Sequence, residues 1–431
     1  MKGRDCDDPR KGSSLQRAGG WQAVMSLIGG RITGALFATA WLVLAARVLA
    51  PAQFGRLAVV IGIGTVASVV VEGGYPLLVA EAIGSDNLRF HAVVRGALRV
   101  RLPLATFAGA ATAAIAWGID GMTGLATGAA YGVWIAASAA QSTFGPGLRA
   151  IGKAKVEAIG EAASRVLTLL IGAPLLWTWR SPVAVALAYG AGSSLAVLWM
   201  WWVARRIASP VAAERWRVSA QRVLPLGVAG VLVTLYNRAD VWLLALLASS
   251  ADVGVYAASY RFYEGLVLPA TAFGALLIPA VAATPTRMKD LVRQYVTGAL
   301  VFAAAGSAAL AIAAPVLVRY VLGTEFLAAV GPVRILSIAA IPASVFSAVA
   351  PLASLRSKRG GSGVLVLGVA ATLVLNAALI PTLGAPGAAI SMVASQSLMA
   401  GCFVAVVRRR SPERGGGSHV ESRLDRSPVL G

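Results

Sequence analysis

The sequence predicts an all-α polytopic membrane protein with twelve transmembrane helices. Twelve apolar runs approach or exceed the roughly 20 residues that a helix needs to cross a bilayer. Only 13% of the residues are charged, about half of the ~25% found in soluble domains. In addition, Lys and Arg gather in every second connecting loop. Because backbone groups in lipid must be hydrogen-bonded within their own segment, these runs are expected to be helices.

The expected spans follow one another with short connections. In chain order they are 21–48, 57–80, 102–119, 122–144, 158–179, 182–203, 223–247, 253–283, 296–318, 326–352, 364–380 and 385–407. The first run is too long, and its flank too charged, for a cleaved signal peptide. We therefore expect it to be retained as the first membrane helix.

The charge of the loops predicts the orientation of the chain. One set of alternate loops contains clusters of cations, such as Arg89, Arg95, Arg99 and Arg101. The other set contains only Arg47, Arg56, Arg180 and Arg319. Cytoplasmic loops collect Lys and Arg, so we expect a multi-pass membrane protein with both termini in the cytoplasm. The same rule accounts for the net charge of +20 without a nucleic-acid partner, which would require a basic soluble domain.

The chain also contains an internal repeat, because LAPAQFGRLA at 49–58 recurs as LASSADVGVYA at 247–257 with one residue inserted. Each copy links the first and second helix of a six-helix half, and such duplication is typical of transporters. Both halves begin on the same side, so the repeat is parallel. The expected parts are a cytoplasmic tail (1–20), an N-lobe (21–204), a linker (205–222), a C-lobe (223–407) and a disordered, cytoplasmic tail (408–431).

Several segments resemble the polysaccharide and oligosaccharide flippases, the O-antigen flippase-like branch of the multidrug/oligosaccharidyl-lipid/polysaccharide exporter superfamily. They are ARVLAPAQFGRLA (46–58), NRADVWLLALLASSADVGVYAASYRF (237–262), VLGTEFLAAVGPVRIL (321–336) and GAPGAAIS (384–391). The resemblance implies two six-helix lobes in a V around a central cavity. It also implies a flippase of the bacterial inner membrane that moves a polyprenyl-diphosphate-linked oligosaccharide to the outer leaflet by alternating access. Membrane lipid, a coupling cation (H⁺ or Na⁺) and glycan polymerase or assembly proteins are the partners that it implies.

Two other functions are alternatives to a flippase. A cation-coupled multidrug exporter of the same superfamily would favour a cavity rich in aromatic residues and carboxylates, whereas five arginines lie within the spans here. A polytopic glycosyltransferase or glycan polymerase would place acidic catalytic residues on large outer loops, but Asp120, Asp252 and Glu325 stand alone on short ones. We therefore expect no enzyme, no catalytic residue and no cofactor. His91 and His419 lack ligand-spaced companions, so no metal site is expected.

Ionisable residues within the spans are the candidate site residues, because charge in a bilayer is costly and usually functional. Arginine offers a planar fork suited to phosphate oxygens. The candidate substrate-binding cations are Arg31, Arg238, Arg261 and Arg334. The candidates for coupling or charge pairing are Glu72, Asp240 and Glu264.

Depth along the helices groups these charges. At about 1.5 Å per residue, Arg31 and Glu72 lie level near the cytoplasmic side, so we expect them to pair. Arg238, Asp240, Arg261 and Glu264 fall roughly 10–16 Å below the outer face, and we expect them to face a cavity between the lobes. Structural pairing and substrate contact both remain open for these groups. Glu161 and Arg165 are expected near the cytoplasmic end of their helix, where snorkelling is the ordinary role.

Overall fold

The computed structural model describes residues 33–85, 89–207, 216, 218–283, 287–356 and 358–409. These residues are almost entirely helical and include no strand. The elements are a helix at Thr33–Val48, α2 (Pro51–Glu72), α3 (Tyr75–Ser85), α4 (Phe90–Ala150), α5 (Ala154–Trp179), α6 (Pro182–Ile207), α7 (Ala220–Leu247), α8 (Ser250–Ala283), α9 (Met288–Leu317), the π-helix η3 (Val318–Leu322), the 3₁₀ helix η4 (Thr324–Ala329), α10 (Val330–Arg356), α11 (Lys358–Leu383) and α12 (Ala385–Arg409).

Nine helices of the described part are long and apolar enough to cross a membrane. Among them α4 reverses its direction at Asp120–Gly121, where the backbone leaves helical geometry. Gly109 approaches Gly132, and Gly128 approaches Ala113, so the two halves of α4 run antiparallel. Residues 21–32 of the expected first span, the tail 1–20 and most of the linker and the last tail lie outside the described residues. The count of twelve spans therefore stays a prediction.

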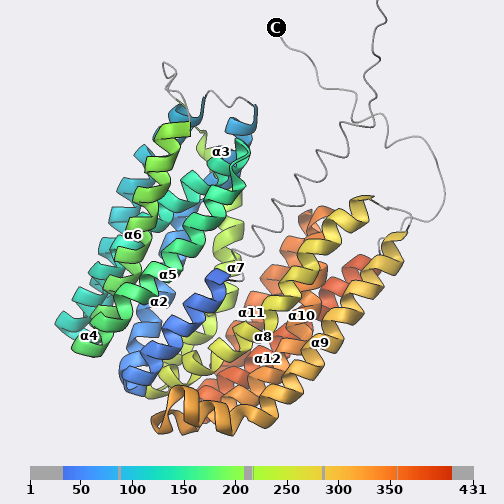
Figure 1. Cartoon of the computed structure of the whole chain (residues 1–431). Coiled ribbons are helices and arrows are strands. Elements are labelled where there is room, and N and C mark those ends of the chain that lie inside the picture. Colours follow the sequence, from blue (N-terminus) through green and yellow to red (C-terminus); the bar gives the residue numbers. More distant parts are fainter. Residues whose placement is uncertain are drawn as a thin grey trace, which may run out of the picture.

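The helices pack in two sets, shown in Figure 1. In the first helix group, α2 packs on α4, α4 and α5 pack on α6, and α3 packs on α4. In the second helix group, α10 contacts α8, α9 and α12, and α11 contacts α12. Helix α7 contacts α2 of the first group and α11 of the second. The two groups lie close at the end where α2 and α8 begin and diverge toward the other end.

The apolar cores follow the same division. One large core contains Leu49 and Phe54 of the first group together with Val253 and Phe326 from the second half of the chain. The rings of Phe54 and Phe326 meet edge to face at 6.1 Å. A second core surrounds Phe90 within the first group, and a third core combines residues of α7, α11 and α12. The molecule is thus joined by a shared core at one end and has separate cores at the other.

The internal repeat forms the closest contact between the groups. Gly55 of α2 and Gly254 of α8 occupy equivalent positions in the two copies. A methyl group on Gly55 would lie 1.9 Å from the carbonyl oxygen of Ser250, and one on Gly254 would lie 1.9 Å from that of Pro51. Only glycine permits this approach of the two backbones. The repeat is therefore the place where α2 and α8 cross.

The structure changes one sequence expectation about helices 2 and 3 and adds a detail to another. The span expected at 57–80 lies within an apolar stretch long enough to cross a membrane, Pro51–Gly84. Its helix is interrupted at Gly73 and Gly74, which have φ angles of 51° and 88°, and Leu226 of α7 packs against Gly74. The cations Arg95, Arg99 and Arg101 are not in a loop, because α4 already begins at Phe90. Hydropathy marks where a helix enters the apolar layer, whereas the hydrogen-bonded helix continues beyond it.

Candidate functional site

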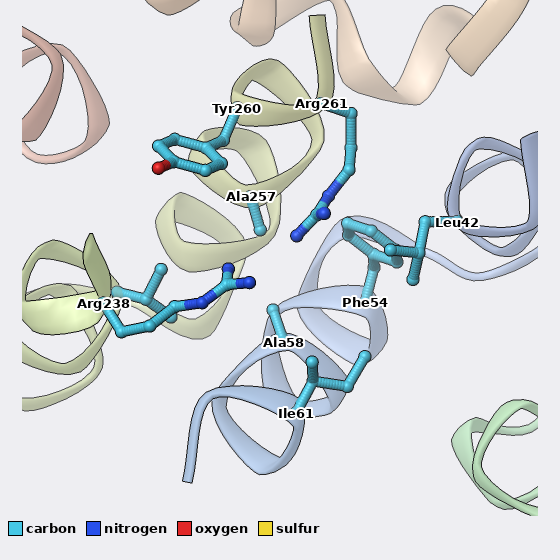
Figure 2. Close-up of a pocket in the computed structure, with 9 residues that line it drawn as sticks. Leu42, Phe54, Ala58, Ile61, Arg238, Ala257, Tyr260 and Arg261 are labelled. Carbon is cyan, nitrogen blue, oxygen red and sulfur yellow. The ribbon is translucent and has the colours of Figure 1, made fainter. Parts of the chain in front are cut away.

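Two arginines from consecutive helices converge on a small cavity between α2, α7 and α8. Arg238 of α7 and Arg261 of α8 point into the same space opposite Phe54 and Ala58 of α2, as Figure 2 shows. The cavity has a volume of about 10 Å³, which is about enough for one water molecule. Its other lining is mainly apolar, so the two guanidinium groups provide the charge of this cavity.

One carboxylate serves both arginines. Glu264 accepts from Nη1 of Arg261 at 2.5 Å, and its other oxygen lies 4.0 Å from Nη2 of Arg238. The Arg261 contact runs along one helix with i,i+3 spacing, as expected from the sequence. Nε of Arg261 is buried and has no hydrogen-bond partner among the described residues. Because each guanidinium has five N–H donors, donors remain available for an anionic ligand.

Asp240 does not share this cavity. Its side chain is buried, it accepts a hydrogen bond from the hydroxyl of Tyr256, and it also accepts from the N–H of Val241 at 2.9 Å. Residues two apart on a helix point in different directions, so Arg238 and Asp240 cannot face the same space. The expectation that all four charges line one cavity is therefore corrected for Asp240.

Asp240 belongs to a buried polar layer of the second half of the chain. The amide of Gln396 on α12 donates to the hydroxyl of Tyr263 on α8 at 3.3 Å. Tyr236 of α7 lies within electrostatic range of Asp240. Several buried polar atoms of this part lack a partner among the described residues, namely the Asn376 amide, Ser391 Oγ and Gln396 Oε1. Oxygen-rich layers of this kind suit hard cations. Among the described residues, no three His, Cys, Asp or Glu side chains lie close enough together to hold a metal ion.

An aromatic cluster of the first helix group lies within electrostatic range of the arginines. Tyr131 and Trp134 of α4 have ring centroids 4.7 Å apart, and Tyr189 of α6 lies 5.8 Å from Tyr131. Both tyrosines interact electrostatically with Arg165 and Arg238. Sequence reasoning missed these aromatic residues, because Tyr131 and Tyr189 lie on different helices and form no local motif.

Arg165 belongs to the same region and not to the end of its helix. It is partly buried, and its Cγ lies 3.6 Å from the position of a methyl group on Gly34 of the first helix. Helix α5 begins at Ala154, so Arg165 lies roughly 16 Å along it. Its position relative to the membrane interface stays a prediction, whereas its packing toward Gly34 is a contact within the helix group. Glu161, one turn earlier, is exposed.

Arg334 has a structural partner outside the cavity. Its side chain is exposed on α10, and its Nε donates to the carbonyl oxygen of Ala311 on α9 at 3.2 Å. Pro315 follows Ala311 by four residues and has no N–H to give to that carbonyl. Arg334 therefore satisfies an acceptor that proline leaves free, and it does not line the cavity of Arg238 and Arg261.

Glu72 is placed beside a cation that the sequence assigned to a loop. Arg31 lies outside the described residues, so its pairing with Glu72 stays a prediction. Within the described part, Glu72 lies near Arg101 and Ser142. Arg101 is fully buried and donates to Val71 O at 3.2 Å, to Thr143 Oγ1 at 2.5 Å and to Ser142 Oγ at 2.7 Å. Ala97 and Ala105, one turn away on each side, are also fully buried, which is the sequence signal that this face of α4 points inward.

Comparison with known proteins adds the fold. No protein-family model and no curated protein matches the chain. Among solved structures, an inward-facing multidrug resistance MATE family transporter of the MOP superfamily matches with a TM-score of 0.69, 16% identity, and coverage of 87% of this chain and 94% of the other. The chain shares the fold of this transporter. The resemblance noted in the sequence is to the same superfamily.

Two further solved structures are similar to this chain. The outward-facing form of such a MATE transporter has a TM-score of 0.61 at 17% identity, with coverage of 90% of this chain and 95% of the other. The lipid II flippase MurJ in an inward closed conformation has a TM-score of 0.59 at 12% identity, with coverage of 90% and 87%. These neighbours are transporters and flippases, and the chain shares their fold.

Proposed function

We propose that the chain is an inner-membrane flippase for a polyprenyl-diphosphate-linked oligosaccharide. The observation that carries this proposal is the convergence of Arg238 and Arg261 on Glu264, together with the buried Nε of Arg261, which has no partner among the described residues. A diphosphate crossing the bilayer needs cationic, multidentate partners, and guanidinium groups supply both properties. The aromatic cluster of Tyr131, Trp134 and Tyr189 provides faces on which sugar rings can pack. Glycan polymerase or assembly proteins would be the partners of such a flippase.

Transport would proceed by alternating access between two six-helix lobes. A cavity of about 10 Å³ is too small for a diphosphate, so α2 must separate from α7 and α8 when substrate enters. The shared core and the Gly55–Gly254 crossing support a state closed at the outer end. The higher TM-score with the inward-facing MATE structure, 0.69 against 0.61, is in line with this state. Both termini would then lie in the cytoplasm.

The substrate is tested by changing Arg261 in a strain that depends on this protein for its surface glycan. Arg261→Ala should abolish glycan export and leave the amount of protein in the membrane near normal. Arg261→Lys should restore export only in part, because an ammonium keeps the charge and loses the fork. Export is measured as surface glycan, and lipid-linked oligosaccharide should accumulate in the inner leaflet.

Arg334→Ala is the matched control, since Arg334 also lies within a span but contacts a carbonyl on α9. It should retain export. A fully active Arg261→Ala protein would remove Arg261 from the mechanism, and a protein that fails to accumulate would make its role structural.

The crossing of α2 and α8 tests alternating access. Gly254→Ala places a methyl group 1.9 Å from Pro51 O, so the outer ends must separate and the outward-open population should rise. Spin labels at the outer ends of α2 and α8 should report a longer distance. Gly331→Ala, which meets no atom within 4 Å, should leave the distance unchanged. Unchanged distances in Gly254→Ala would contradict an outer closure at this crossing.

Topology is tested by cysteine labelling in intact cells. A cysteine at Ala251, beside the start of α8, should react with an impermeant reagent from outside. A cysteine at Gly361 should react only after the membrane is permeabilised. Equal labelling of both positions from outside would overturn the proposed orientation.

Asp240 is the proposed site of coupling to H⁺ or Na⁺. It is a buried carboxylate in a layer whose Asn376 and Ser391 oxygen atoms have no partner among the described residues. Asp240→Asn should remove the dependence of transport on the cation gradient and retain the folded protein, because an amide still accepts from Tyr256. A variant whose export responds to the gradient as the wild type does would exclude this residue from coupling.

A cation-coupled multidrug exporter is the second candidate. The aromatic cluster beside the cavity and the likeness to MATE transporters favour it. Such an exporter should lower the sensitivity of its host to cationic drugs, and loss of the gene should leave surface glycan intact. The opposite pair of results would favour the flippase.

A further inference from the structure

A second, larger cavity lies on the face of the first helix group that points away from the second helix group. It opens between α4 and α6, which Figure 1 shows on the side of the first group remote from the second group. Its volume is about 810 Å³, within the roughly 300–1,000 Å³ of small-molecule sites. No residue of this groove belongs to the Arg238–Arg261 cavity. The groove is therefore separate from the proposed substrate site.

The lining changes from basic to apolar along the groove. Arg95 and Arg99 lie one turn apart on α4, and Arg205 lies one turn beyond Trp201 on α6. Helix α4 begins at Phe90 and α6 ends at Ile207. The three arginines therefore lie at the same end of the groove, near the start of α4 and the end of α6. Leu102 and Trp201 line the deeper part. This polarity runs in the same direction as that of a phospholipid, with the headgroup at the surface and the chains below.

The arginines of the groove lack acidic partners among the described residues. Arg149 pairs with Glu157 and Arg222 pairs with Glu81, both at 3.3 Å, whereas the groove is lined by arginines and no carboxylate. The guanidinium of Arg205 lies over the ring of Trp201 at 4.2 Å. Stacking engages the face of the guanidinium and leaves its N–H edge free for a phosphate.

We propose that this groove binds an anionic phospholipid of the cytoplasmic leaflet. Arg95, Arg99 and Arg205 hold the headgroup phosphate, and one acyl chain lies along Leu102 and Trp201. Basic pockets between membrane helices on the cytoplasmic side recognise anionic headgroups in this way. The assignment of the leaflet rests on the orientation proposed above. The binding itself depends on neither the glycan nor transport.

Native mass spectrometry of the purified full-length protein tests the proposal, with phosphatidylglycerol and phosphatidylcholine of identical chains as probes. The wild type should bind phosphatidylglycerol more tightly, by roughly a hundredfold if each of three cations contributes as expected near a membrane surface. Arg95→Gln/Arg99→Gln/Arg205→Gln should bind the two lipids equally. Arg206→Gln/Arg287→Gln/Arg293→Gln removes the same charge from exposed positions outside the groove and should keep the preference.

A second pair of variants tests the apolar half. Leu102→Trp fills the deeper part of the groove and should weaken binding of phosphatidylglycerol, whereas Leu104→Trp, exposed but outside the groove, should not. A groove-arginine variant that keeps the wild-type preference would overturn the proposal. Tighter binding of polyprenyl monophosphate than of phosphatidylglycerol would overturn it too, because the groove would then serve the carrier lipid. Arg261→Ala should retain the lipid preference even if glycan export fails, which separates this test from that of the proposed function.

Discussion

Arg101 of α4 and Arg261 of α8 both place a positive charge on a largely apolar helix, and their surroundings differ. Arg101 is fully buried in the first helix group, where its guanidinium donates to Val71, Ser142 and Thr143 and lies near Glu72. Arg261 lines a cavity, contacts Glu264, and keeps a buried Nε without a partner among the described residues.

The comparison shows that charge within a membrane span does not by itself indicate a binding site. An arginine whose three nitrogens each donate to its own fold stabilises that fold, since buried polar groups must be hydrogen-bonded. An arginine with donors left over can take up an anion. The free donors of the side chain, and not its depth, separate the two roles.

The largest expected effect is on the structural arginine. Arg101→Ala leaves Glu72 without its cation and should lower the free energy of unfolding by about 3–5 kcal/mol. The protein should fail to accumulate in the membrane, as measured by immunoblot and by thermal unfolding of any purified fraction. Adding Glu72→Gln should recover part of the stability, because no uncompensated charge then remains. Normal accumulation of Arg101→Ala with loss of export would contradict a purely structural role of Arg101.

Arg238 should behave like Arg261. Arg238→Ala should reduce export strongly at a normal protein level, because Glu264 keeps its contact with Arg261 and is not left as an uncompensated charge. Surface glycan and protein level measured in the same cells report both quantities. A strong loss of protein would show that Arg238, like Arg101, stabilises the fold.

Glu264 should compete with the ligand for the arginines. Glu264→Gln frees the donors that the carboxylate now engages, so inorganic pyrophosphate should bind roughly tenfold more tightly, equivalent to about 1.4 kcal/mol. Calorimetric titration of purified protein measures this change. Weaker binding would show that Glu264 positions the arginines for their ligand.

The smallest expected effect is at Arg334. Arg334→Ala removes one hydrogen bond to the carbonyl of Ala311 on an exposed side chain, which typically contributes about 0.5–1.5 kcal/mol. The melting temperature should fall slightly and export should persist. Loss of export at full stability would return Arg334 to the candidate substrate-binding residues.

Some of these features could be predicted from the sequence. The membrane class follows from apolar runs of sufficient length, and the repeat at Leu49–Ala58 and Leu247–Ala257 marks the two helices that cross. The i,i+3 pairing of Arg261 with Glu264 follows from helical spacing alone. The different directions of Arg238 and Asp240 could also have been derived from their separation by two residues.

Only the tertiary structure decided which residues meet across helices. It placed Glu72 beside Arg101, brought Tyr131 and Tyr189 together, and gave Arg334 the carbonyl that Pro315 leaves free. It also broke the second span at Gly73–Gly74, where Leu226 of α7 packs against the chain. Hydropathy and local charge are fixed by neighbours in the sequence, so they determined the class of this protein. The partner of a side chain depends on how each helix is rotated and packed, and that is set by contacts between residues far apart in the chain.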